Sequence, residues 1–170
     1  MLFEFYPWKI EADVEATKRL YLTNDYAKDK SINQKFYGTM SDKQKDFFIS
    51  LGVDIMKTDA EEKTHSVPDE GEIPGEKIYV RSIDFLFCGR FHTIPEYQRH
   101  FYSDGEAFGE ELPKTLKIVP MSKEEKIPVF GIDGLPCVFK HPRLRFDTPE
   151  FRKWDCGYIL GSILTMKDLS

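Results

Sequence analysis

The chain has 170 residues, of which 41% are hydrophobic and 31% are charged, and its net charge is -5. A chain of this length and composition can bury a core without disulfide or metal staples, so we expect a single domain over residues 1–170. Nucleic-acid and membrane partners are not expected, because phosphate binding needs a basic face and no segment approaches the ~20 apolar residues of a membrane span.

The cysteines and the N-terminal residues bear on the cellular compartment in which the protein is expected. Cys88, Cys137 and Cys156 form an odd, widely spaced set without a Cys-x-x-Cys pair. The first residues lack the positive leader and apolar core of a secretion signal. We therefore expect a cytoplasmic protein with reduced cysteines, and the sequence does not indicate its oligomeric state.

The first segments predict a short strand followed by helices. Residues 2–6 alternate as a strand does, and a helical period follows over residues 13–22, with Asp13 able to cap its first turn. A second helical period runs from Ser31 to Met40, and Ser31 could cap this helix.

The third predicted helix carries the clearest signals. Ser41 and Gln44 have the spacing of a capping box, and Gly52 can supply the left-handed residue that ends the helix. Phe47, Phe48 and Leu51 form its buried stripe. We therefore expect residues 1–57, the N-terminal third, to be mainly helical.

Residues 58–170 have the character of strands. The run 78–91 is apolar on both alternating faces, which predicts a central strand. Asp133 and Gly134 form a strong hairpin signal. Further strands are expected at residues 64–67, 116–119, 127–132 and 136–139.

The C-terminal residues predict one late helix and a last strand. Asp147 or Thr148 can cap a helix with Pro149 in its first turn, and the apolar run 158–166 fits a buried strand. Most of the predicted helices precede most of the predicted strands. The chain therefore lacks the alternation of strands and helices that is typical of a parallel sheet. The predicted class is therefore α+β, with a mostly antiparallel central sheet.

A doubled Cys-x-x-x-His pattern is the most chemical feature of the sequence. It comprises Cys88 with His92 and Cys137 with His141. In strands, residues four apart lie ~13 Å apart, whereas ligands of one zinc ion approach within ~4 Å of each other. We therefore predict no metal site, and no phosphate-binding or cofactor motif is present.

A small enzyme is the alternative that these residues leave open. Asp84, Cys88 and His92 share one strand face, and a thiolate would need a base such as His141 or His100 from elsewhere. Asp84 is notable because an acid inside an apolar run must find a partner, for which Arg81, Arg143 or a backbone amide would serve. Inert, buried cysteines are the favoured interpretation.

An aromatic segment provides candidate residues for binding a ligand or partner. These residues are Tyr97, His100, Phe101, Tyr102 and Phe108. They could line a pocket or a protein-binding loop, although a short amphipathic helix packed on the sheet explains them equally well.

Residues 5–10, 47–54 and 153–158 carry a resemblance to known sequences. Through them the chain resembles small hypothetical proteins of Gram-positive bacteria. This resemblance implies a cytoplasmic bacterial protein and no particular activity. The expected function is a non-catalytic binding or protein-interaction domain, whose partner is an unknown protein or small molecule. The alternative is the small enzyme, with a Cys/His/Asp cluster or a bound metal.

Overall fold

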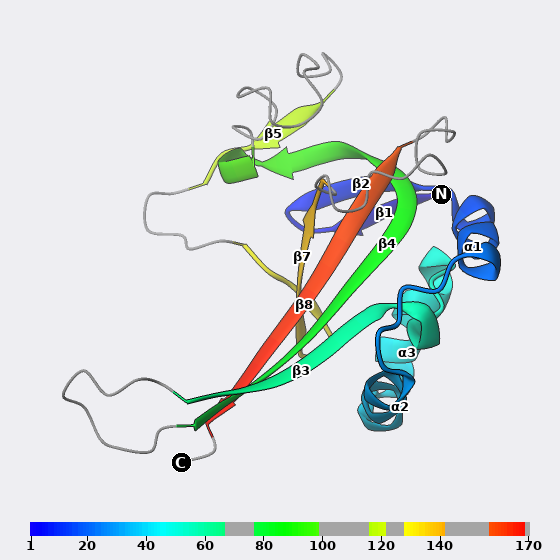
Figure 1. Ribbon diagram of the computed structural model, residues 1–170. Coiled ribbons are helices and arrows are strands. Elements are labelled where there is room, and N and C mark those ends of the chain that lie inside the picture. The colour runs from blue at the N-terminus through cyan, green and yellow to red at the C-terminus, as the bar shows by residue number, and fades with distance from the viewer. Residues whose placement is uncertain (67–76, 99–115, 122–127, 142–156, 169–170) are drawn as a thin grey trace.

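The computed structural model describes residues 1–66, 77–98, 116–121, 128–141 and 157–168. In these ranges the fold is mixed α+β: three α-helices lie along one flank of an eight-stranded sheet (Figure 1). All strand pairs are antiparallel except β4 with β5. The predicted α+β class is therefore confirmed. Among the described helices, none has the length and apolar character needed to cross a membrane.

The sheet begins at the N-terminus. Strands β1 (Leu2–Phe5) and β2 (Trp8–Ala12) form an antiparallel hairpin. Ile10 is fully buried in β2. The expected helical N-terminal third is therefore not confirmed as a whole, because the period-two burial of β2 precedes the first helix.

The helices follow as α1 (Val14–Thr23), α2 (Lys30–Thr39) and α3 (Asp42–Leu51), and a short 3-10 helix η1 (Ile55–Lys57) completes this part. Asp13 caps α1 as predicted. The cap of α2 is Asp29 and not Ser31, because the Asp29 carboxylate accepts hydrogen bonds from both the N–H and the hydroxyl of Ser31.

Helix α3 is anchored at both ends. Its predicted capping box is present, and Gly52 ends it with a φ of 79°. The Ser41 hydroxyl donates to Asp133 Oδ2 at 2.6 Å, and Gln44 Nε2 donates to the Asp133 carbonyl at 2.9 Å. The start of α3 is thus fixed on the turn of a distant hairpin.

Strand β4 (Lys77–Pro95) is the central strand that the sequence predicts. It pairs with β8 (Tyr158–Asp168) over residues 78–88 and with β3 (Asp59–Ser66) over residues 77–84. Beyond β3, residues 89–93 of β4 pair with β2. The weak strand expected at residues 64–67 is therefore part of a longer one that starts earlier.

The remaining strands are β5 (Lys117–Val119), β6 (Phe130–Ile132) and β7 (Leu135–Lys140), with η2 (Glu96–Gln98) after β4. The turn between β6 and β7 has positive φ at Asp133 and Gly134, as a tight hairpin turn requires. The predicted late helix lies outside the described residues. The final strand is β8, and its far end is buried on one face only, since Leu164 and Met166 are exposed.

Helix α1 fills a break in the pairing of β4. Residues 85–88 lie between the segments that pair with β3 and β2. Here the Tyr21 hydroxyl donates to the Leu86 carbonyl and accepts from the Leu86 N–H, at 2.6 and 3.2 Å. Thr17 Oγ1 accepts from the Cys88 N–H at 2.9 Å. Side chains of α1 thus replace a neighbouring strand.

Candidate functional site

Both described cysteines are enclosed in the core. Cys88 on β4 and Cys137 on β7 are 0% exposed. Burial raises the pKa of the Cys137 thiol well above its usual range, so this thiol stays protonated at neutral pH. Neither residue presents a nucleophile to a substrate at the surface.

Asp84 has one partner on the neighbouring strand β8. The Ser162 hydroxyl donates to Asp84 Oδ1 at 2.7 Å. The sequence had suggested Arg81, Arg143 or a backbone amide for this role; Arg143 lies outside the described residues. The carboxylate therefore links β4 to β8 across their hydrogen-bonded pairing.

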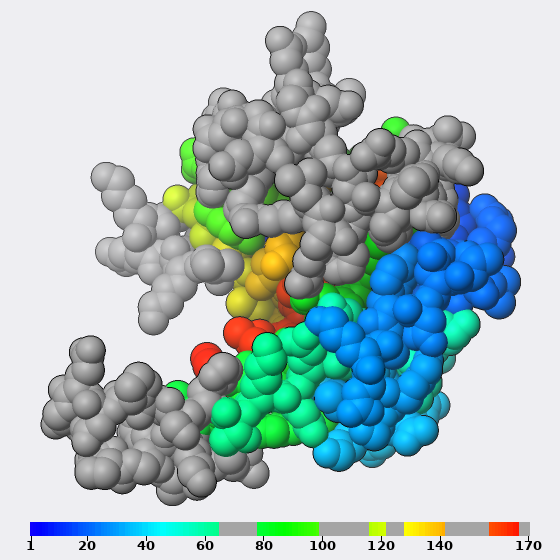
Figure 2. Space-filling model, viewed as in Figure 1, coloured from blue at the N-terminus to red at the C-terminus, as the bar shows by residue number. Residues whose placement is uncertain are grey.

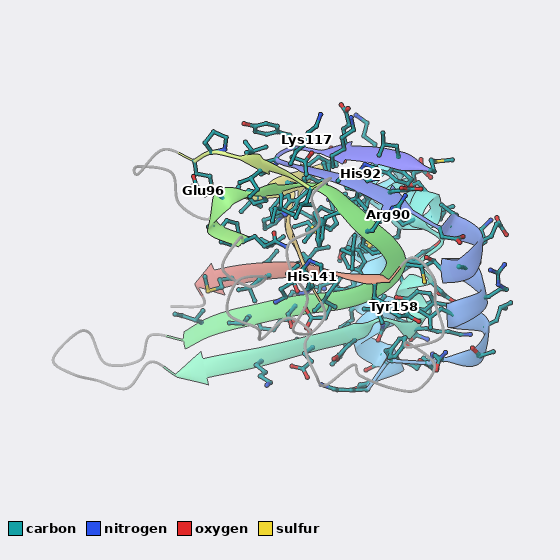
Figure 3. All side chains as sticks on the ribbon, turned by 90° about the horizontal axis from the view of Figure 1, so that it is seen from above. Arg90, His92, Glu96, Lys117, His141 and Tyr158 are labelled. Atoms are coloured by element: carbon teal, nitrogen blue, oxygen red, sulfur yellow. The ribbon has the colours of Figure 1, made fainter. Side chains whose placement is uncertain are left out.

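His92 belongs to a charged cluster with Glu11 and Arg90. Glu11 Oε2 lies 2.8 Å from His92 Nε2 and from Arg90 Nε, and 2.7 Å from Arg90 Nη2. The hydrogen bonds from His92 and Arg90 lower the pKa of Glu11. Arg90 and His92 lie along the same stretch of β4 (Figure 3). The carboxylate orients the imidazole, but the side chains are 41% to 63% exposed, so water screens their interactions.

His141 packs against an aromatic ring and not against this cluster. Its ring centroid is 5.0 Å from that of Phe91, in an edge-to-face arrangement. Burial lowers the pKa of His141 to about 4, so the imidazole is neutral at pH 7. Among the described residues, Asp84, His92 and His141 thus contact different partners, namely Ser162, Glu11 and Phe91.

Acidification is expected to destabilise the protein through His141. In the unfolded chain His141 binds a proton near pH 6.5, whereas in the folded chain it does so only near pH 4. The free energy of unfolding therefore falls as the pH drops below 6.5. At pH 5 the loss is about 2 kcal/mol from this residue. Urea unfolding at pH 7 and pH 5 measures it, and His141→Gln should lose less stability between these values than wild type. Equal losses in both proteins would contradict the assignment.

The aromatic segment predicted for binding is described only at its start. Tyr97 lies in η2, half-buried against the core, and burial raises its pKa to about 12. The neighbouring Gln98 accepts a hydrogen bond from Trp8 Nε1 at 2.8 Å. His100, Phe101, Tyr102 and Phe108 lie outside the described residues.

A groove lies between the three helices on the helical flank of the sheet, and this flank forms the blue and cyan surface in Figure 2. Its volume is about 590 Å³, within the range of ligand sites. We call it the helical groove. It is lined by Lys18, Tyr21 and Leu22 of α1, Tyr37 of α2, Lys45 and Ile49 of α3, and residues 52–57.

The rim of the helical groove exposes large apolar side chains. Leu22 is 78% exposed, Ile49 is 65% exposed and Tyr37 is 46% exposed. Gly52, at the end of α3, allows a close approach to α1, because a Cβ there would come within 2.5 Å of the Val14 carbonyl oxygen. Three helices therefore converge on a hollow whose apolar rim faces solvent.

In the described part of the chain, three lysines and one carboxylate line the helical groove. Lys45 Nζ lies 4.3 Å from the centroid of the Tyr37 ring, and Lys57 Nζ donates to the Tyr21 carbonyl at 2.5 Å. Asp54 is engaged in capping η1, where it accepts from the Met56 N–H. The groove can therefore hold an apolar group between positive charges.

The helical groove is not evident from the amino-acid sequence. The available signal is that Leu22, Tyr37 and Ile49 lie off the buried stripes of their helices, and this signal does not show that the three side chains converge. Comparisons of the chain with models of protein families, with curated proteins and with solved structures found no match.

Proposed function

We propose that this protein is a non-catalytic interaction domain that binds a segment of a partner protein in the helical groove. The observation that carries the proposal is the exposure of Leu22, Tyr37 and Ile49 around one hollow. Contiguous apolar surface of this kind costs free energy in water and is characteristic of binding sites.

A protein segment fits the groove better than a small molecule held inside it. Leu22 and Ile49 are more than half exposed, so they stand at the rim. A ligand confined to the hollow would leave these side chains in water, whereas a segment laid across the groove covers them. Apolar anchors of an amphipathic segment commonly bind between helices in this way.

The surroundings of the residues considered for catalysis support the same choice. Cys88 is fully buried, and the pKa of His141 keeps its imidazole neutral at pH 7. The carboxylate of Asp84 accepts from Ser162 within the sheet. A binding function is compatible with the surroundings that Cys88, His141 and Asp84 have in the structure.

Peptide selection with a matched surface control tests the proposal. Peptides of ~12 residues are selected by phage display on the full chain, and their affinity is measured by fluorescence anisotropy. Leu22→Ser and Ile49→Ser should each weaken binding by about tenfold or more, as expected for apolar anchors at an interface. Leu164→Ser removes an apolar side chain from β8 that is 51% exposed and lies outside the groove, and it should leave affinity unchanged.

Two results would contradict the proposal. If the selected peptides bind all three variants as wild type does, their site lies elsewhere. Alternatively, Leu164→Ser could weaken binding as much as Ile49→Ser, which would make the effect a general one. Far-ultraviolet circular dichroism of each variant checks that the fold is retained.

A further inference from the structure

The charge of the helical groove is opposite to that of the whole chain. The chain has 24 basic and 29 acidic residues, a net charge of -5. Among the residues that the structure describes, the groove is lined by Lys18, Lys45 and Lys57 and by one carboxylate, that of Asp54. A positive site on an acidic protein attracts negative groups locally and selects against positive ones.

The contacts that the charged side chains of the groove already make do not cancel its positive charge. Lys18 pairs with Glu15 at 2.9 Å, but both side chains are more than half exposed, so the pair is weak and exchangeable. Lys45 lies over the Tyr37 ring, a contact that keeps its charge. Asp54 already accepts a backbone N–H as the cap of η1, which offsets part of its charge.

Helices α1 and α3, which form two walls of the groove, each place a lysine one turn before an exposed apolar residue. On α1, Lys18 lies one turn before Leu22, and on α3, Lys45 lies one turn before Ile49. Residues four apart lie on the same helix face, so each wall presents an ammonium beside an exposed apolar side chain. A complementary segment has apolar side chains for the centre and carboxylates at its flanks.

We infer that the partner segment is acidic and amphipathic, with Asp or Glu residues flanking its apolar anchors and pairing with Lys18 and Lys45. This inference rests on the proposed function, because it names the chemistry of the segment that the helical groove takes. The apolar anchors supply most of the affinity, and the lysines select the sign of the flanks.

Three synthetic peptides test the sign of the charge. They share one apolar core and carry flanks of Glu, Gln or Lys. By fluorescence anisotropy with the full chain, the Glu peptide should bind at least about tenfold more tightly than the Lys peptide, with the Gln peptide between them. The difference should shrink when NaCl is raised from about 50 to about 300 mM, because salt screens exposed charges.

A pair of double variants assigns the preference to the groove. Lys18→Glu combined with Lys45→Glu should reverse the order of the Glu and Lys peptides. Lys43→Glu combined with Lys63→Glu makes the same change in net charge at exposed lysines that do not line the groove. This control should keep the order of the wild type.

The possible failures separate the inference from the proposed function. If all three peptides bind equally and Ile49→Ser weakens each of them, the groove binds apolar segments and the acidic preference is wrong. If the control double variant reverses the order as well, the preference comes from net charge and not from the groove. If no peptide responds to Leu22→Ser or Ile49→Ser, the groove is not the binding site and both ideas are wrong.

Discussion

Gly161→Ala is expected to lower the free energy of unfolding by about 3 kcal/mol, at the upper end of the cost of overpacking a core. Gly161 on β8 lies opposite Phe85, and an added Cβ would come within 2.1 Å of the Phe85 ring. That ring cannot easily move, because Phe48 and Phe87 pack against it with centroids 5.0 and 6.1 Å away. Urea unfolding followed by circular dichroism measures the loss.

A second strand glycine provides the control for this substitution. A Cβ at Gly131 on β6 would meet no atom within 4 Å, so Gly131→Ala should change stability by less than about 1 kcal/mol. In a Phe85→Ala background, Gly161→Ala should cost much less than in wild type, because the clashing ring is gone. An undiminished cost there would show that backbone strain, and not the ring, disfavours a side chain at Gly161.

Local signals predicted the parts of the fold that depend on neighbouring residues. The capping box of Ser41 and Gln44 needs only the first turn of one helix, and it is present. The hairpin at Asp133 and Gly134 likewise needs two residues that tolerate positive φ. Strand β4 was predicted because apolar side chains on both faces require neighbours on both faces.

Strand register is the information that the sequence did not contain. Glu11, Arg90 and His92 come together because β2 pairs with β4 in one register, which shifts at a bulge between Lys9 and Ile10. A slip of one residue would place these side chains on opposite faces. The predictions therefore named His92 without its carboxylate partner.

The helical groove depends on how three helices approach each other. Each helix shows an exposed apolar residue that, taken alone, is ordinary on a protein surface. Only their convergence at Leu22, Tyr37 and Ile49 makes a site, and this depends on the close packing of Gly52 against Val14. The candidates chosen from aromatic richness, such as Tyr97, were selected by composition, which carries no such geometry.

Tyr21→Phe is expected to cost about 2 to 3 kcal/mol, although it removes a single oxygen atom. The Tyr21 hydroxyl bonds both the N–H and the C=O of Leu86, which are buried where β4 has neither β3 nor β2 beside it. Phenylalanine would leave both backbone groups unsatisfied, which is the costly way to lose a hydrogen bond. Urea unfolding of Tyr21→Phe against wild type measures this.

The matched control is Tyr37→Phe, which removes the same atom from a tyrosine that is 46% exposed, and it should change stability by less than about 0.5 kcal/mol. Comparable losses in the two variants would show that the Tyr21 hydroxyl does not replace a neighbouring strand. A large loss confined to Tyr21→Phe would mean that α1 completes the pairing of β4. Because α1 also forms one wall of the helical groove, the Tyr21→Phe variant should then bind the selected peptides more weakly as well.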